Sequence, residues 1–151
     1  MAAEPLHLQD ALAVVHGHAS PLPASEVPLT EAVGHVLAAD AVSALDLPPF
    51  ANSAMDGFAV RASDCSGATP EAPVVLKLSG ESRAGQPAQI ALEGGCAMPI
   101  STGAVMPLGG DAVLRVEDAV IADGQLSITQ SLPTGHDVRP AGDDISSGQT
   151  V

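Results

Sequence analysis

A short corner at residues 52–60 carries the side chains best suited to chemistry. It reads Asn-Ser-Ala-Met-Asp-Gly-Phe-Ala-Val and is entered through Leu-Pro-Pro-Phe at 47–50. The two prolines fix the backbone dihedral φ on the way in, and Gly57 permits backbone conformations that other residues avoid. The pattern predicts that Asp56 is held at a turn, where its negative charge suits contact with a metal or a hydrogen-bond donor. An ordinary Asp-Gly turn without a function is the alternative.

A second loop, Ile-Ser-Thr-Gly-Ala at 100–104, places hydroxyl groups at a strand end just before a glycine. A backbone N–H and a side-chain oxygen can converge on one ligand in such a loop. Thr102 is therefore suited to a hydrogen bond with a phosphate or another oxoanion. A hydroxyl that only caps the strand end is the alternative for Thr102.

The charge of the chain constrains its partners. Eighteen Asp and Glu against five Lys and Arg give a formal net charge of −13. Such a surface repels nucleic-acid phosphates and anionic membranes, so neither is an expected partner. The first five residues lack the basic and apolar regions of a signal peptide, and no apolar stretch is long enough to span a bilayer. Cys65 and Cys96 lie thirty-one positions apart and are expected to be free thiols of a cytoplasmic protein.

Composition predicts a mixed α+β fold that is mostly β. The chain has no Trp or Tyr and only two Phe, so its core must be built from Ala, Val, Leu and Ile. Fifteen Gly and thirteen Pro fall between short apolar runs, which is too many for a helical bundle. Closely spaced short strands are typical of a small barrel or sandwich, in which closure hides the sheet edges.

Local patterns place the elements. Apolar spacing predicts an N-terminal helix from Pro5 to about Ala19. Thr30 is a suitable N-cap for a helix of one or two turns that Gly34 would end. The Asp-Gly pair at 123–124 predicts a hairpin, because both residue types tolerate positive φ. The expected strands are 25–29, 35–43, 57–61, 73–81, 89–92, 97–101, 112–116, 119–121 and 126–128.

Four segments form an ordered signature: 28–40, 47–64, 101–104 with 110–113, and 135–148. Together they resemble the MoeA family, the molybdopterin molybdenumtransferases of molybdenum cofactor biosynthesis, which includes the E domain of gephyrin. The resemblance covers almost the whole chain but only the N-terminal part of such proteins, which continue into a MogA-like α/β domain and a small β domain. In the last segment, Arg139 is followed by the adjacent carboxylates Asp143 and Asp144, which are expected to tie the domain together rather than to do chemistry.

The resemblance also implies a division of the chain. Residues 1–24 would hold the N-terminal helix, and residues 25–46 the first half of an elongated linker domain. A small β-barrel or sandwich module at 47–134 would be inserted there, followed by the truncated second half of the linker domain at 135–151. That last segment would return to the sheet begun by residues 25–43. A homodimer that shares its site between subunits, and a MogA-like domain or protein, are the expected partners.

By the same resemblance, Asp56 and Thr102 belong to the active site, Asp56 is also the metal ligand, and Ser53, Gly57 and Gly103 contact the cofactor. The implied reaction inserts molybdate into adenylylated molybdopterin with Mg²⁺. The isolated chain is expected to be inactive, since its acidic surface repels molybdate and phosphate, and the cationic contacts would come from a further domain or a partner subunit. The alternative is a non-catalytic scaffold or dimerisation module of the same fold.

Overall fold

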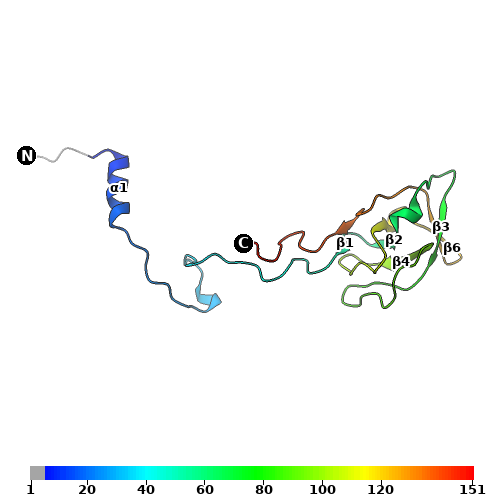
Figure 1. The fold of residues 1–151 in the computed structure, drawn as a ribbon, viewed down its shortest axis with the longest axis horizontal. Coiled ribbons are helices and arrows are strands. Elements are labelled where there is room, and N and C mark those ends of the chain that lie inside the picture. Colours follow the sequence, from blue (N-terminus) through cyan, green and yellow to red (C-terminus); the bar gives the residue numbers. More distant parts are fainter. Residues whose placement is uncertain (1–5) are drawn as a thin grey trace, which may run out of the picture. The chain divides into compact units, whose positions relative to one another are not determined.

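The chain divides at residue 40 into two units, in a computed structural model that describes residues 6–151 (Figure 1). The first unit contains the helix α1, Leu8–His18, and the short 3₁₀ turn η1, Leu29–Glu31. The predicted N-terminal helix is therefore confirmed, and its expected start at Pro5 lies outside the described residues. No residue of α1 is buried. A helix of 11 residues gains little stability without a packed face, so α1 is a weakly stabilised element in this chain.

Two expected elements of the N-terminal region are wrong. The strands at 25–29 and 35–43 do not form, because these segments find no ladder partner and pair only through the single bridge from Val42 to Thr150. An extended, apolar segment becomes a strand only when a neighbour satisfies its N–H and C=O groups. The helix expected after Thr30 is only η1, in which Thr30 is an internal residue and Pro28 is the N-cap. Gly34 follows it with a positive φ of 86°.

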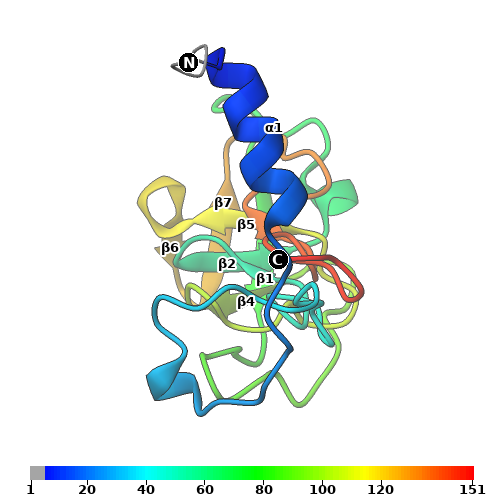
Figure 2. The ribbon, with the colours of Figure 1, turned by 90° about the vertical axis from the view of Figure 1, so that its left-hand side faces the viewer.

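The second unit, Ala41–Val151, is built on a curled six-stranded sheet in the order β5-β2-β4-β3-β7-β6, with β1 and β8 forming a separate pair (Figures 1 and 2). Of the strand pairs in the described chain, only β3 and β4 are parallel. The strands are β1 Asn52–Ser53, β2 Gly57–Val60, β3 Val74–Leu78, β4 Cys96–Ile100, β5 Ala112–Arg115, β6 Val120–Ala122, β7 Gln125–Ile128 and β8 Val138–Arg139. Short 3₁₀ turns follow β2 and β5, namely η2 Ala62–Cys65 and η3 Val116–Asp118.

Six of the strands expected from the sequence are confirmed with ends that differ by up to three residues, and the fold is mostly β as predicted. The hairpin at 123–124 is also confirmed, since Asp123 and Gly124 have φ values of 51° and 71° between β6 and β7. The strand expected at 89–92 is wrong. Its Leu92 is buried, but the N–H of Leu92 donates to the carbonyl of Leu108 in a loop contact. A short apolar run can bury a side chain without joining a sheet.

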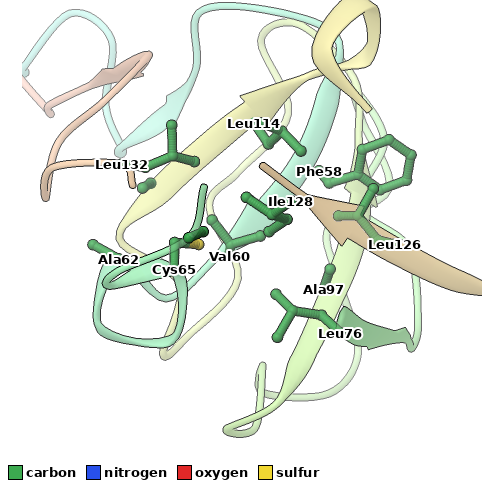
Figure 3. Close-up of a cluster of buried hydrophobic side chains, with 12 residues drawn as sticks. Phe58, Val60, Ala62, Cys65, Leu76, Ala97, Leu114, Leu126, Ile128 and Leu132 are labelled. Carbon is green, nitrogen blue, oxygen red and sulfur yellow. The ribbon is translucent and has the colours of Figure 1, made fainter. Parts of the chain in front are cut away.

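The core lies on both faces of β2, whose four residues are all buried. Phe58 and Val60 join Leu114 of β5 and Leu126 of β7 in one cluster, in which these side chains point toward one another (Figure 3). β5 is one edge strand of the sheet and β7 lies next to the other edge, so a single cluster that joins them requires the sheet to curl. On the other face, Ala59 packs in a second cluster with Met98, Ile100 and Val113. The core is thus mainly aliphatic, as the composition predicts, and Phe58, Met98 and Cys65 complete it.

Both cysteines are free thiols, as expected. Cys65 belongs to the first core cluster, and burial raises the pKa of its thiol to about 11, with further contributions from the charges of Asp64 and Asp111. A thiol with so high a pKa is almost entirely protonated at neutral pH, and the thiolate is the reactive form. Cys65 is therefore a core residue and not a nucleophile.

The C-terminal segment runs back along the segment that leads into β1 (Figure 1). The N–H of Val151 donates to the carbonyl of Ala41, and a bridge joins Leu47 to Ile145 before β8 pairs with β1. The expected return to residues 25–43 is thus correct only at its last few residues. The boundaries expected at residues 24, 46 and 134 stay predictions.

Candidate functional site

The corner that carries Asp56 is held by hydrogen bonds before, within and after it. The Ser53 hydroxyl donates to the carbonyl of Met55 at 2.6 Å, which closes a tight turn within the corner. The N–H of Ala54 donates to the carbonyl of Asp137 at 2.9 Å. After the corner, the N–H of Val116 donates to the carbonyl of Asp56 at 3.0 Å. These contacts leave the Asp56 backbone little freedom, while its side chain is exposed.

Gly57 is needed for close approach and not for an unusual φ, which corrects the expectation from the sequence. It is the first residue of β2 and is absent from the positive-φ residues of the described chain. A Cβ at this position would overlap the carbonyl oxygen of Leu114 and lie 2.9 Å from its carbonyl carbon. Only glycine lets β5 come this close to β2 at the base of the corner.

The structure brings the two predicted active-site residues together, although they lie 46 positions apart. Asp56 Oδ1 accepts a hydrogen bond from the Thr102 N–H at 2.7 Å and another from the Thr102 hydroxyl at 3.0 Å. Thr102 lies in a turn closed by the N–H of Ala104 and the carbonyl of Ser101, in which Gly103 has a φ of 77°. The N–H of Gly103 then donates to the carbonyl of Ser53, which ties this turn to the Asp56 corner.

The Asp56 carboxylate is ionised and directed to solvent. The pKa of Asp56 lies below its ordinary value, first because of the hydrogen bond from the Thr102 backbone and second because of the bond from its hydroxyl. A carboxylate that accepts such bonds is favoured in its charged form. No hydrogen bond reaches Oδ2 from the described residues, so that oxygen is available to a cation or to a donor on a ligand.

The three predicted cofactor contacts differ in their surroundings. Ser53 is only 1% exposed and its hydroxyl is bonded to Met55, while Gly57 is buried in the sheet. Both residues position the corner. Gly103 is exposed beside Thr102, with no atom within 4 Å of where a Cβ would be. The assignment of cofactor contacts to these residues stays a prediction, and Gly103 has the open surroundings that such a contact requires.

A metal at this site would take one ligand from the described chain. Within residues 6–151, no three His, Cys, Asp or Glu side chains gather into a metal site. Mg²⁺ is commonly held by one or two carboxylates together with substrate phosphates and water, rather than by an all-protein cage. The free oxygen of Asp56 fits that mode of binding.

An ion pair beside the corner could not be identified from the sequence. Arg115 donates to both carboxylate oxygens of Asp137, from Nε to Oδ2 at 2.7 Å and from Nη2 to Oδ1 at 3.1 Å. Asp137 has a φ of 50°, a left-handed conformation that non-glycine residues rarely adopt. The sequence shows only that Asp137 follows a Gly-His pair at a possible turn. That pattern does not reveal that its ion-pair partner lies 22 residues away. Arg139 likewise pairs with Asp143 and Asp144, within the segment expected to be tied together.

Acid is expected to remove the contribution of the Arg115–Asp137 ion pair to stability. The hydrogen bond from Arg115 holds the pKa of Asp137 below its ordinary value of 3.8. A carboxyl group with a pKa depressed by folding stabilises the fold above the unfolded-state pKa, and this contribution is lost as the pH falls through the folded-state pKa. The urea midpoint of the native chain should exceed that of Asp137→Asn near neutral pH, and the gap should close below pH 3.8. A gap that is constant with pH would contradict this prediction.

Membrane-spanning helices are absent from the part of the chain that the structure describes. The chain matches the family model of the MoeA N-terminal region (domain I and II) over residues 6–151. It is 44% identical over 125 residues to molybdopterin molybdenumtransferase 2 of Mycobacterium tuberculosis, a match that covers 83% of this chain and 31% of that protein. It is 40% identical over 132 residues to the molybdopterin molybdenumtransferase of Synechococcus elongatus, covering 87% of this chain and 33% of the relative.

Solved structures agree with these sequence matches. A crystal structure of the molybdopterin biosynthesis MoeA protein from Pyrococcus horikoshii superposes with a TM-score of 0.80 at 35% identity, covering 84% of this chain and 34% of that one. A second crystal structure of a molybdopterin biosynthesis MoeA protein from the same organism has a TM-score of 0.81 at 36% identity and covers 97% of this chain and 38% of that one. The chain thus spans about a third of the length of the relatives it matches. With an N-terminal family match over nearly all its residues and the same fold, this chain belongs to the MoeA family.

Proposed function

We propose that this chain supplies the Asp56–Thr102 half of the active site of a molybdopterin molybdenumtransferase. The reaction is the insertion of molybdate into adenylylated molybdopterin in molybdenum cofactor biosynthesis. One observation carries the assignment of residues: Asp56 is exposed, one of its oxygens is fixed by the two donors of Thr102, and the other has no hydrogen-bond partner among residues 6–151. The names of the relatives support the reaction class.

Asp56 would hold Mg²⁺ through its free oxygen, and Thr102 would fix the orientation of the carboxylate. When bound, Mg²⁺ supplies neutralisation of phosphate charge, which assists cleavage of a phosphoanhydride. The Thr102 turn also exposes Gly103, where the backbone can approach a ligand closely. The proposed role of these residues is thus to bind the metal ion and to orient the carboxylate that holds it.

The remaining contacts to the anionic substrates would come from outside this half. The chain has only five Lys and Arg against eighteen Asp and Glu, which gives a net charge of −13. Of these five, Arg115 and Arg139 are already paired with carboxylates. A second subunit of a homodimer and a MogA-like domain or protein are the proposed sources of cationic groups. A cytoplasmic location belongs to the same proposal and agrees with the free state of the two cysteines.

A chimera tests this function. The 151-residue chain replaces the matching segment of the Mycobacterium tuberculosis relative, and molybdate insertion into adenylylated molybdopterin is measured with and without Mg²⁺. We expect a Mg²⁺-dependent activity within about tenfold of that of the relative, because the fold and the Asp56–Thr102 contact are carried by this chain alone. The isolated chain is the control and is expected to be inactive. A folded chimera without activity would contradict the proposal.

A non-catalytic interaction module is the second candidate. The helix α1 favours it, because Leu8 and Val15 are 72% and 64% exposed and no residue of α1 is buried. Unpaired apolar helical residues are typical of association surfaces. A chimera that is inactive but dimeric would support this second function over the first.

A further inference from the structure

Asp137 is hydrogen-bonded to residues on both sides of Asp56: to Ala54 before it and to Arg115, next to Val116, whose N–H bonds the Asp56 carbonyl. Its main-chain carbonyl accepts the hydrogen bond from the N–H of Ala54, at the start of the corner. Its carboxylate accepts the two hydrogen bonds from Arg115, at 2.7 and 3.1 Å. The Asp137 side chain is only 15% exposed, so this ion pair is less open to solvent than an ordinary surface pair.

Arg115 holds the other end of the same corner. It is the last residue of β5 and lies directly opposite Gly57 in the β2–β5 ladder. The next N–H along the chain, that of Val116, donates to the carbonyl of Asp56 at 3.0 Å. The contacts therefore form a closed ring that runs from Ala54 to Asp137, through the ion pair to Arg115, and across the ladder to Gly57. The chain from Ala54 to Gly57 closes the ring, and Asp56 is part of that segment.

The conformation of Asp137 requires support from its surroundings. A non-glycine residue with a φ of 50° is strained by about 1 kcal/mol, although Asp tolerates this region better than most residues. The neighbouring residue helps to hold it, since the carbonyl of His136 accepts a hydrogen bond from Val113 of β5 at 2.9 Å. His136 Nε2 also lies 3.5 Å from Asp137 Oδ2. Strained residues that are fixed in this way are concentrated at functional sites.

We propose that Arg115 and Asp137 are positioning residues, whose ion pair fixes the Asp56 carboxylate at the place where Thr102 can hold it. The two hydrogen bonds from Thr102 need Oδ1 at 2.7 and 3.0 Å, and hydrogen bonds weaken steeply when their distance and angle change. A corner free to shift would lose them. The relevance of this device to catalysis depends on the proposed function, but the positioning itself can be measured without any activity.

The test is an NMR titration of the 151-residue chain, followed at the Asp56 side-chain carboxyl carbon and at the Thr102 amide proton. Asp137→Asn and Arg115→Met each break the ion pair. Positioning predicts that both variants raise the pKa of Asp56 and move the Thr102 amide proton upfield, because both loosen the same hydrogen bonds. Direct charge effects predict opposite signs, since loss of a carboxylate lowers the pKa of Asp56 and loss of a guanidinium raises it.

Further variants separate positioning from a general loss of stability. Glu81→Gln is the control for loss of a surface ion pair, because it breaks the more exposed pair of Glu81 with Arg83 and should leave both Asp56 and Thr102 unchanged. The double variant of Arg115 and Asp137 should shift Asp56 no further than either single variant does. If Asp137→Asn does not fold, Arg115→Lys takes its place in the test. This variant keeps the charge but not the two-point contact, and it should also raise the pKa of Asp56.

A folded Asp137→Asn protein in which the pKa of Asp56 falls or stays the same would overturn the proposal. So would a folded Arg115→Lys protein in which Asp56 and Thr102 titrate as in the native chain. An inactive chimera combined with the expected shifts in both variants would overturn the proposed function and leave the positioning role intact.

Discussion

Gly57→Ala is expected to destabilise the second unit by at least about 3 kcal/mol, a large fraction of the stability of a domain of this size. The added methyl group would overlap the carbonyl oxygen of Leu114 and crowd the Cα of Arg115 at 3.0 Å. Both are backbone atoms of β5, so no side-chain rotation relieves the contact. The two strands would have to separate at the position where all four residues of β2 are buried.

Urea unfolding followed by circular dichroism measures this effect. Gly94→Ala is the matched control, because a Cβ there would meet only the end of the flexible Arg61 side chain, 3.0 Å from Nη1. The control should cost less than about 1 kcal/mol, since the guanidinium can move away. Equal stability of the Gly57→Ala protein and the control would show that β5 does not lie as close to β2 as described.

Asp56→Asn in the chimera is expected to lower molybdate insertion about 100-fold or more, with little change in stability. Asn keeps the shape of the side chain and can still accept hydrogen bonds from Thr102 through its amide oxygen. It lacks the negative charge that would hold Mg²⁺. Thr102→Ala should cost less, about tenfold, because it removes the hydroxyl donor and leaves the backbone N–H donor at 2.7 Å.

The comparison is made at saturating Mg²⁺, with the melting temperature of each variant measured in parallel. Glu71→Gln removes an exposed carboxylate elsewhere in the second unit and serves as the control for loss of charge. Unchanged activity of Asp56→Asn, in a protein that melts as the native one does, would remove Asp56 from the site.

Short-range patterns were sufficient for much of the sheet. The short apolar runs that form β2 and β5 and the Asp-Gly turn at 123–124 predicted these elements correctly, because each depends on neighbours in sequence. The segments 25–29 and 35–43 have similar apolar patterns but form no strand, since a strand also needs a partner that no local window reveals.

The site shows the same limit at the level of single residues. Asp56 and Thr102 could be selected as candidates from their residue types and the resemblance of their segments to a family, and the structure places the two candidates in contact. Gly57 was singled out for the wrong physical reason, because a close approach to Leu114 depends on strand register. The pair of Arg115 and Asp137 could not be predicted, since it forms only after β5 and the loop before β8 are brought together.

The hydrogen bond between Ala54 and Asp137 also limits the order in which the chain can fold during synthesis. Its two residues are 83 positions apart, so the corner cannot be completed until the ribosome has released the segment around residue 137. At roughly 5–20 residues per second, the nascent chain waits roughly 4–17 seconds after translating Ala54 before its partner is even synthesised. Every strand of the six-stranded sheet is translated before that partner. During synthesis, the sheet can therefore assemble first, and the carboxylate of Asp56 acquires its final support last.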